Sequence, residues 1–253
     1  MELITSRQNR ICTEIRRLRS SRSARYKAGL YIADGLKLIQ EALRWNADIA
    51  YIAAVPEIYP DIPDTLQRYA LSPELMEYVS SMDSPQGAIA VIRMPQLPVC
   101  KLHPGTLILD HIQDPGNLGT ILRTADAFDI PVVLSDGCAD PFSEKTVRSS
   151  MGAIFRSLPA AAHTDTIIAF AASAALPIAV ATLAPDSVDI RNGKVSEHIV
   201  VIGNEGHGVS REFMEAAQTH FIIPMTERCE SLNAATAATV FMWQQLNEKH
   251  AGS

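Results

Sequence analysis

Two short apolar runs near the end of the chain constrain its fold most strongly. Residues 199–202 and 221–223 each have the length and composition of a buried parallel strand. Each run leads into a loop of small, polar and bend-forming residues, and a long segment rich in alanine and threonine follows, which we predict to be a helix. In an open α/β sheet, ligands bind beyond the carboxyl ends of the strands. The two loops therefore predict a binding crevice at that edge of the sheet.

Apolar runs alternate with helical patterns from residue 106 onward. The pattern predicts strands at 106–110, 131–134, 178–182, 199–202 and 221–223, and helices at 117–128, 143–151, 165–175, 210–217 and 231–247. Such alternation is typical of a parallel α/β sheet. The uncharged stretch 166–185 imitates a membrane span, but Pro177 divides it, so we predict a buried helix followed by a strand and no membrane partner.

The first ninety residues predict a smaller α/β domain. Its expected elements are helices at 9–20, 35–45 and after Pro73, and strands at 30–33, 49–55 and 88–92. Two prolines hold the segment 94–98 extended, which is typical of a linker. We therefore predict a first domain over 1–94, a linker over 95–104 and a second domain over 105–253.

Charge is distributed unevenly along the chain. The formal net charge is −6, yet residues 1–30 carry eight arginine or lysine side chains against two acidic ones. A basic segment gains free energy at a phosphate backbone by displacing condensed counterions. A solvated helix face has the same composition, so charge alone leaves both interpretations open.

The four cysteines, Cys12, Cys100, Cys138 and Cys229, are scattered and form no C-x-x-C pair. This spacing argues against a zinc site or a disulfide framework, and no other ligand cluster suggests a metal. It favours a reducing, cytoplasmic location. The polar, basic N-terminus lacks the apolar core of a signal peptide, which favours the same location.

Three segments of the second domain resemble known motifs. They are DHIQDPGNLGTILRTADAF at 110–128, GNEGHGVS at 203–210, and IPM at 223–225 with ESLNAA at 230–235. In this order they resemble the three motifs of the SpoU-type (TrmH-like) RNA ribose 2′-O-methyltransferases of the SPOUT superfamily. The basic segment also resembles the start of many such enzymes, which favours RNA as its partner, although Asp34-Gly35 replaces their usual Glu-Gly.

The resemblance implies a fold and an activity. Members of the family tie a deep C-terminal trefoil knot that holds S-adenosylmethionine, and they pair as homodimers through the knot. Their N-terminal domain resembles a ribosomal protein and binds structured RNA. The implied reaction is methylation of a ribose 2′-hydroxyl, with ribosomal RNA favoured over transfer RNA. The alternatives are the same chemistry on transfer RNA and a non-catalytic RNA-binding relative. A dinucleotide-dependent enzyme is disfavoured, because the chain lacks a G-x-G-x-x-G fingerprint after its first strand.

Residue roles follow from the matching positions. Arg123 matches the family's key catalytic arginine. It would act either as the base or as a positive charge that binds a phosphate and stabilises the forming alkoxide. Asn117, Ser231 and Asn233 match polar site residues, although all three could also cap helices. Glu205 matches the glutamate of the second motif. His111 and His207 are not expected to act as bases, because the family does not rely on histidine there.

The resemblance also assigns binding residues. The predicted cofactor contacts are Thr182, Leu183, Gly203, Ile223, Met225 and Leu232. The predicted RNA contacts are Arg7, Arg10, Arg16, Arg17, Arg19, Arg22, Arg25, Lys145 and Arg148. For Lys145 and Arg148, which share a helix face, a role at a helix end or in a dimer is the equal alternative.

Overall fold

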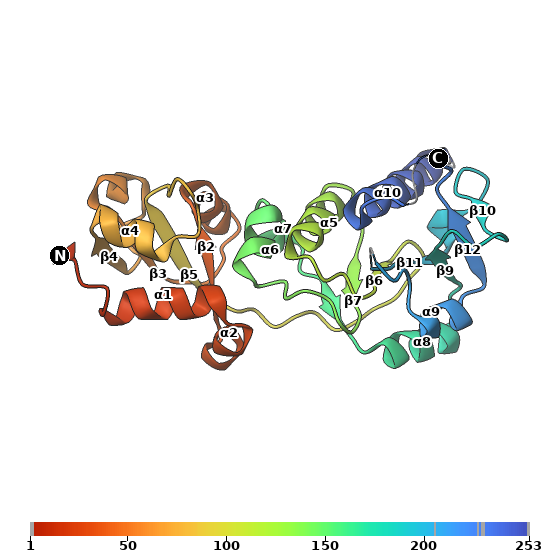
Figure 1. The fold of residues 1–253 in the computed structure, drawn as a ribbon, viewed down its shortest axis with the longest axis horizontal. Helices are drawn as coiled ribbons and strands as arrows, with labels where there is room; N and C mark the ends of the chain where they lie inside the picture. The colour runs from red at the N-terminus through yellow and green to blue at the C-terminus, as the bar shows by residue number, and fades with distance from the viewer. Residues whose placement is uncertain (1–2, 205, 227, 229–230, 252–253) are drawn as a thin grey trace. The chain divides into compact units, whose positions relative to one another are not determined.

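A computed structural model describes residues 3–204, 206–226, 228 and 231–251 of the chain. The fold divides into two compact units, and the colour in Figure 1 follows the residue number through both. The first unit comprises Met1–Gln96 and Asp140–Arg156, and the second comprises Leu97–Ala139 and Ser157–Ser253. The sequence prediction assigned residues 140–156 to the second domain, whereas their packing groups them with the first.

A five-stranded sheet forms the centre of the first unit. Its strands are β1 (Leu3–Ile4), β2 (Leu30–Asp34), β3 (Ile49–Ala54), β4 (Arg68–Leu71) and β5 (Ala88–Arg93), in the order β1-β4-β3-β5-β2. β5 runs antiparallel to both β2 and β3, and the other pairs are parallel. The helices are α1 (Arg10–Ser20), α2 (Arg22–Ala28), α3 (Leu36–Arg44), α4 (Pro73–Val79), α6 (Glu144–Ser149) and α7 (Ala153–Arg156), with a 3-10 turn η1 at Pro56–Asp61.

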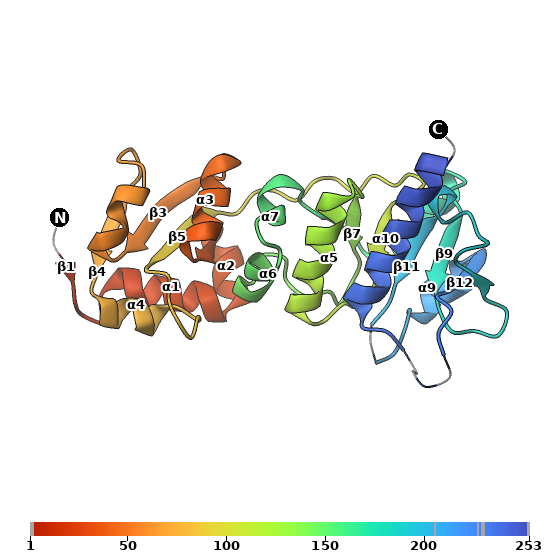
Figure 2. The same cartoon turned by 90° about the horizontal axis from the view of Figure 1, so that it is seen from above.

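Helices cover both faces of this sheet. Ile11, Ile15 and Leu18 lie on one side of α1 and pack with α4 over the strands. α3 covers the opposite face, as Figure 2 shows. The Asn9 side chain caps the start of α1, where it accepts a hydrogen bond from the Ile11 amide at 2.9 Å.

The second unit contains a seven-stranded sheet whose paired strands are all parallel. Its strands are β6 (Leu107–Leu109), β7 (Val132–Leu134), β8 (Ala160–Ala161), β9 (Ile178–Ala181), β10 (Val188–Asp189), β11 (Ile199–Ile202) and β12 (Thr219–Ile222), in the order β10-β12-β9-β11-β6-β7-β8. The helices are α5 (Pro115–Ala127), α8 (Thr164–Ser173), α9 (Arg211–Ala216) and α10 (Ala234–Ala251), with a 3-10 turn η2 at Val195–Glu197.

The central strands of this sheet are buried on both faces. α8 and α9 pack on one face, where Ile167 and Phe213 contact the strand core. α5 and α10 lie side by side on the other face. The C-terminal end of α10 is bound to η2 through Glu248. The Glu248 carboxylate accepts hydrogen bonds from the Val195 and Ser196 amides at 3.2 and 2.8 Å.

The predicted α/β class and parallel sheet are confirmed, and the stretch 166–185 is a helix and a strand as predicted. The short elements α2 and β4 were not predicted. α5 begins at Pro115, two residues earlier than predicted, because Asp114 caps it by accepting the Asn117 amide at 2.9 Å. The trefoil knot stays a prediction.

A buried ion pair joins the two segments of the first unit. Arg25 is 4% exposed, and its guanidinium donates to Asp140 at 2.6 and 2.9 Å. The same side chain donates to the Leu18 carbonyl at 2.7 Å. Asp140 also accepts the Tyr26 hydroxyl and the Phe142 amide. Arg25, which was predicted to contact RNA, therefore has its donors engaged inside the fold.

Breaking this pair should destabilise the first unit. We expect Arg25→Ala to lower the free energy of unfolding by about 3–5 kcal/mol, because Asp140 stays buried without a counter-charge. Lys27→Ala removes an exposed cation of the same helix and should change that energy by less than about 0.5 kcal/mol. Urea unfolding followed by circular dichroism measures both. Equal effects of the two substitutions would contradict a structural role for the pair.

Candidate active site

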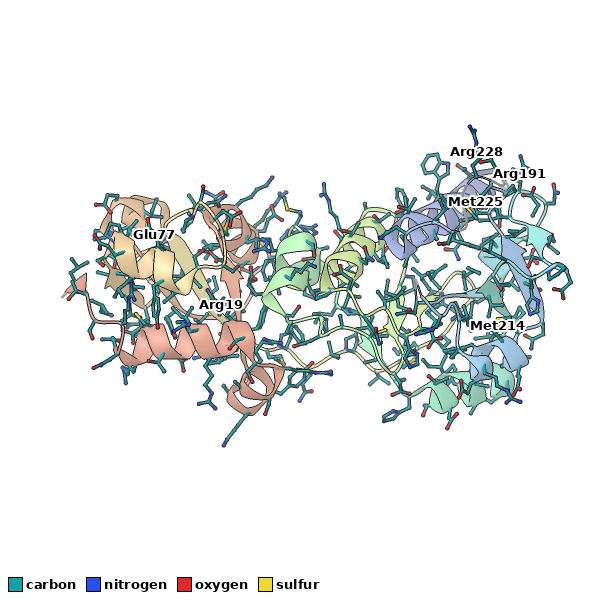
Figure 3. The ribbon with its side chains drawn as sticks, viewed as in Figure 1. Arg19, Glu77, Arg191, Met214, Met225 and Arg228 are labelled. Carbon is teal, nitrogen blue, oxygen red and sulfur yellow. The ribbon has the colours of Figure 1, made fainter. Side chains whose placement is uncertain are left out.

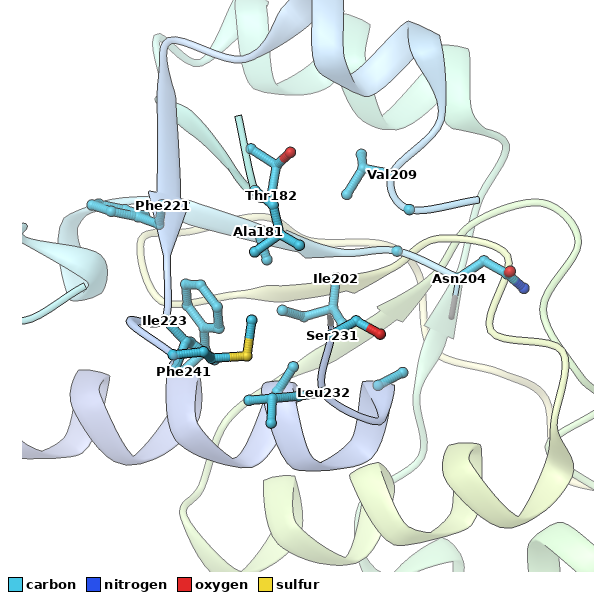
Figure 4. A pocket seen from close by; sticks show the side chains of 16 residues that line it. Ala181, Thr182, Ile202, Asn204, Val209, Phe221, Ile223, Ser231, Leu232 and Phe241 are labelled. Atoms are coloured by element: carbon cyan, nitrogen blue, oxygen red, sulfur yellow. The ribbon is translucent and has the colours of Figure 1, made fainter. Parts of the chain in front are cut away.

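A pocket of about 330 Å³ lies at the carboxyl ends of β9, β11 and β12, against the first turns of α10. Its walls are mostly apolar. In Figure 4, Thr182 and Val209 lie on one side, and Leu232 and Phe241 lie on the side of α10. The pocket therefore occupies the edge of the sheet that the two loops predicted.

The loop after β11 folds back on itself at one wall of the pocket. Asn204 and Gly208 exchange backbone hydrogen bonds at 3.0 and 2.9 Å. A Cβ atom at Gly203 would lie 2.3 Å from the backbone of Gly208 and Val209, so only glycine fits there. The Asn204 side chain donates to the His111 carbonyl at 2.9 Å and ties this loop to the loop after β6.

A buried carboxylate connects three of the loops at this edge. Asp110 is 0% exposed and directly follows β6. Its oxygens accept the Ser135 hydroxyl at 2.8 Å, the Ser210 amide at 2.7 Å and a hydrogen bond with His111 Nδ1 at 2.9 Å. Ser135 follows β7 and Ser210 precedes α9. Asp110 belongs to the first motif, and no role was predicted for it. A charged residue directly after a buried strand is the sequence signal that could have indicated such a network.

Two predicted site residues from distant motifs are in direct contact. The Asn233 amide nitrogen donates to the Asn117 side-chain oxygen at 3.0 Å. The Asn233 side-chain oxygen also accepts the Ala235 and Thr236 amides at 2.9 and 3.3 Å, which caps α10. Asn233 thus caps α10, which was one of the two alternatives, and its role in the active site stays a prediction. Asn117 does not cap α5, because Asp114 does.

The remaining predicted catalytic residues, Arg123, Ser231 and Glu205, do not share one environment. Arg123 is exposed on α5, and within the described part of the chain its guanidinium forms no ion pair or hydrogen bond. Its positive charge is therefore available to a ligand. Ser231 lines the pocket. Glu205 lies outside the described residues.

All six residues predicted to contact the cofactor line the pocket: Thr182, Leu183, Gly203, Ile223, Met225 and Leu232. Apolar side chains together with the exposed backbone of strand ends suit a flat adenine ring and its ribose. The residues present therefore fit S-adenosylmethionine. Sequence reasoning missed Ile202, Val209, Phe221 and Phe241, which also line the pocket, because strand ends and a helix face have the same composition as the core.

Cys138 lies beside this network without acting as a nucleophile. Its thiol donates to the Leu109 carbonyl at 3.1 Å, and burial raises its pKa to about 11. A protonated thiol is a poor nucleophile. The described cysteines Cys12, Cys100 and Cys138 are free, and Cys229 lies outside the described residues.

Several cations predicted to contact RNA are engaged within the first unit. The guanidiniums of Arg7 and Arg16 lie 4.6 and 4.2 Å from the centre of the Tyr78 ring. Arg19 donates to the carbonyls of Val79 and Ser80 at 3.0 and 2.7 Å (Figure 3). These arginines hold α1 against α4.

Arg148 is also engaged: it pairs with Glu144 at 2.7 Å and donates to Ser81 at 2.9 Å. Lys145 and Arg22 are exposed.

Arg10 and Arg17 line a groove on the surface of the first unit. With Lys27 they line a groove of about 600 Å³ between α1 and α2, here called the α1–α2 groove. Arg10 and Arg17 are seven residues apart and share one face of α1. Lys27 was not among the predicted contacts.

The described residues contain no group of three or more histidine, cysteine, aspartate or glutamate side chains that could hold a metal ion. No helix among them has the length and apolar character needed to cross a membrane.

Two protein families match the chain. The SpoU rRNA Methylase family matches residues 104–243, and the MRM3-like substrate binding domain matches residues 9–90. The first match contains the pocket and its loops, and the second contains the basic helices and most of the first sheet.

Individual relatives match over nearly the whole length. A 23S rRNA guanosine 2′-O-methyltransferase of Bacillus subtilis (strain 168) is 31% identical over 96% of this chain and 98% of its own. A 23S rRNA uridine 2′-O-methyltransferase of Streptomyces viridochromogenes is 28% identical over 98% of this chain and 93% of its own. The crystal structure of an AdoMet-bound rRNA methyltransferase from Sinorhizobium meliloti has a TM-score of 0.85 and 30% identity, with 97% of both chains covered.

Proposed function

Because the chain belongs to the SpoU rRNA methylase family, we propose that it methylates the ribose 2′-hydroxyl of a nucleotide in ribosomal RNA, with S-adenosylmethionine as the methyl donor. The observation that carries the proposal is the Asn233–Asn117 hydrogen bond, which joins α5 to the segment that lines the apolar pocket. The two relatives named above act on different nucleotides of 23S rRNA, so the proposal names ribosomal RNA and no single base.

The reaction needs a nucleophile and a methyl group held in line. S-adenosylmethionine supplies an electrophilic methyl group when it is bound. Ile223 and Leu232 would hold its adenine ring by apolar contact, and the close backbone approach at Gly203 shapes the pocket wall. These residues orient the donor and exclude water from it.

Arg123 acts on the nucleophile side of the reaction. A guanidinium keeps its positive charge in proteins and offers a planar fork of donors. Because Arg123 has no carboxylate partner among the described residues, it can grip the target phosphate and stabilise negative charge on the 2′-oxygen. The site is exposed at Arg123, so solvent can accept the hydroxyl proton. Asn117, held by Asn233, fixes the start of the same helix.

This role predicts a loss of rate without a loss of cofactor binding. Arg123→Ala should lower turnover by about 10²–10⁴-fold, because its charge acts mainly on the transition state. Arg123→Lys should restore little, since an ammonium lacks the planar fork. Affinity for S-adenosylmethionine should stay unchanged, because Arg123 does not line the pocket. Single-turnover methyl transfer to a 23S rRNA transcript and cofactor titration measure the two effects.

Arg211→Ala is the matched control for this experiment. Arg211 is an exposed arginine of the same unit, and it pairs with Glu215 at 2.6 Å. Near wild-type turnover in Arg123→Ala would remove Arg123 from the mechanism. No methyl transfer by the wild-type protein would refute the proposed function itself.

RNA binding by the first unit is the second part of the proposal. The α1–α2 groove is concave, and the exposed cations Arg10, Arg17 and Lys27 line it beside Glu14. The Glu14 carboxylate accepts the Tyr51 hydroxyl at 2.5 Å, so part of its charge is engaged inside the fold. We assign this groove to the phosphate backbone of the RNA.

The double variant Arg10→Ala/Arg17→Ala should bind RNA more weakly and with a flatter salt dependence. Each lost phosphate contact reduces the slope of log K against log salt by about 0.7–0.9. The control is Arg68→Ala/Arg93→Ala, which removes two arginines that pair with Asp64 and Asp48. Filter binding at several salt concentrations measures the slopes. An unchanged slope in the groove variant would show that these arginines only solvate the surface.

A homodimer through α10 is the third part of the proposal. Trp243 is 53% exposed on this helix, and its ring packs 5.9 Å from that of Phe128 at the end of α5. Val240 and Ala237 are only partly buried. This surface is more apolar than one buried stripe requires, and isologous pairing would cover it.

A cytoplasmic location, which the free cysteines favour, completes the proposal.

Trp243→Glu should convert the dimer to a monomer and lower methyl transfer, because a charge cannot be buried unpaired at the interface. Phe170→Glu, which alters another exposed aromatic residue, on α8, should leave both properties unchanged. Sedimentation velocity gives the mass of each variant. A wild-type monomer with full activity would contradict the dimer.

A further inference from the structure

An exposed indole lies at the end of α3 in the first unit. Trp45 is 45% exposed, although tryptophan is on average a highly buried residue type. The guanidiniums of Arg44 and Arg156 lie 5.9 and 5.7 Å from the centre of its ring. Part of the indole surface thus remains open to solvent between two cations from different segments of the chain.

Glu41 organises this cluster. Its carboxylate pairs with Arg156 at 2.6 Å and approaches Arg44 at 3.9 Å. The Trp45 amide donates to the Glu41 carbonyl at 3.1 Å. At Gly152, where φ is +91°, a Cβ atom would lie 3.0 Å from the Glu41 side chain, so the turn before α7 packs closely on α3. The close pair with Glu41 therefore holds Arg156 beside the ring before any ligand binds.

The arrangement has the chemistry of a nucleotide contact. Unpaired RNA bases are recognised by stacking on aromatic rings and on arginine planes, and the adjacent phosphates pair with cations. The side chain of Arg44 is 72% exposed, so it can reach a phosphate. Isolated exposed apolar residues are common on surfaces and need no partner. Trp45 differs from them because two guanidiniums from different segments of the chain lie against its ring.

We propose that Trp45 is a stacking platform for one unpaired base of the RNA substrate, and that Arg44 contacts a neighbouring phosphate. This proposal rests on the RNA substrate proposed above and adds a structural preference to it. A platform of this kind selects a loop, bulge or single-stranded segment, because a base inside a helix cannot expose its face.

Variants at Trp45 test the platform in the full-length protein. Trp45→Ala should weaken binding of a single-stranded RNA of about 12 nucleotides by roughly 5- to 20-fold, and Trp45→Phe should keep most of the affinity. The salt dependence should not change in either variant, because no phosphate contact is lost. Phe170→Ala, which removes an equally exposed aromatic ring from the second unit, should have no effect. Thermal melting of each variant shows that the fold is intact.

Fluorescence gives an independent measurement, since the chain has two tryptophans. In a Trp243→Phe background, Trp45 is the one remaining indole. The single-stranded probe should quench its emission, and the same sequence paired in a duplex should quench it much less. Equal quenching by both probes, or binding of the single strand with no quenching, would overturn the platform.

The outcomes also separate this inference from the proposed function. If the wild-type protein methylates a 23S rRNA transcript while Trp45→Ala binds RNA normally, the platform is wrong and the function stands. If Trp45 responds to RNA but no methyl transfer occurs, the platform stands and the catalytic proposal fails.

Discussion

The site depends on one buried negative charge. Asp110 has no exposure to solvent, so its carboxylate must be satisfied by donors inside the protein. Those donors come from the loop after β7, from the residue before α9 and from His111. Ser210 belongs to the loop that borders the pocket, and His111 lies on the segment that leads to α5. The position of one side chain thereby fixes loops that are far apart in the sequence.

Much of the second unit could be predicted because its sequence patterns are local. The apolar runs that became β9 and β11 lie within one residue of their predicted bounds, and the six residues matched to cofactor contacts line one pocket. The contact of Asn233 with Asn117 could not be predicted, since it depends on packing across 116 residues, whereas the capping of α10 by Asn233 is local. At Asp110 the position of the carboxylate after a buried strand was the local signal, whereas its donors lie up to 100 residues away.

Charge pattern was a weaker guide in the first unit. The eight cations of residues 1–30 look alike in the sequence, yet Arg25 is buried in an ion pair, Arg16 lies on an aromatic ring, and Arg17 lines an exposed groove. Composition reports how many charges are present, and tertiary packing decides which of them remain available. Trp45 carried no signal at all, because the cations around it come from α3 and from a segment more than a hundred residues later.

The discontinuity of the first unit bears on how the chain matures during translation. Arg25 and Asp140 are 115 residues apart, so the ribosome releases the whole first sheet long before the partner of its buried arginine exists. Domains generally fold from the N-terminus as they emerge. Here the nascent first unit lacks the carboxylate partner of Arg25 until β6, α5 and β7 have also been synthesised. Completion of the first unit therefore follows the synthesis of the first segment of the second unit, Leu97–Ala139, which keeps unfinished chains from acquiring a fully formed first unit.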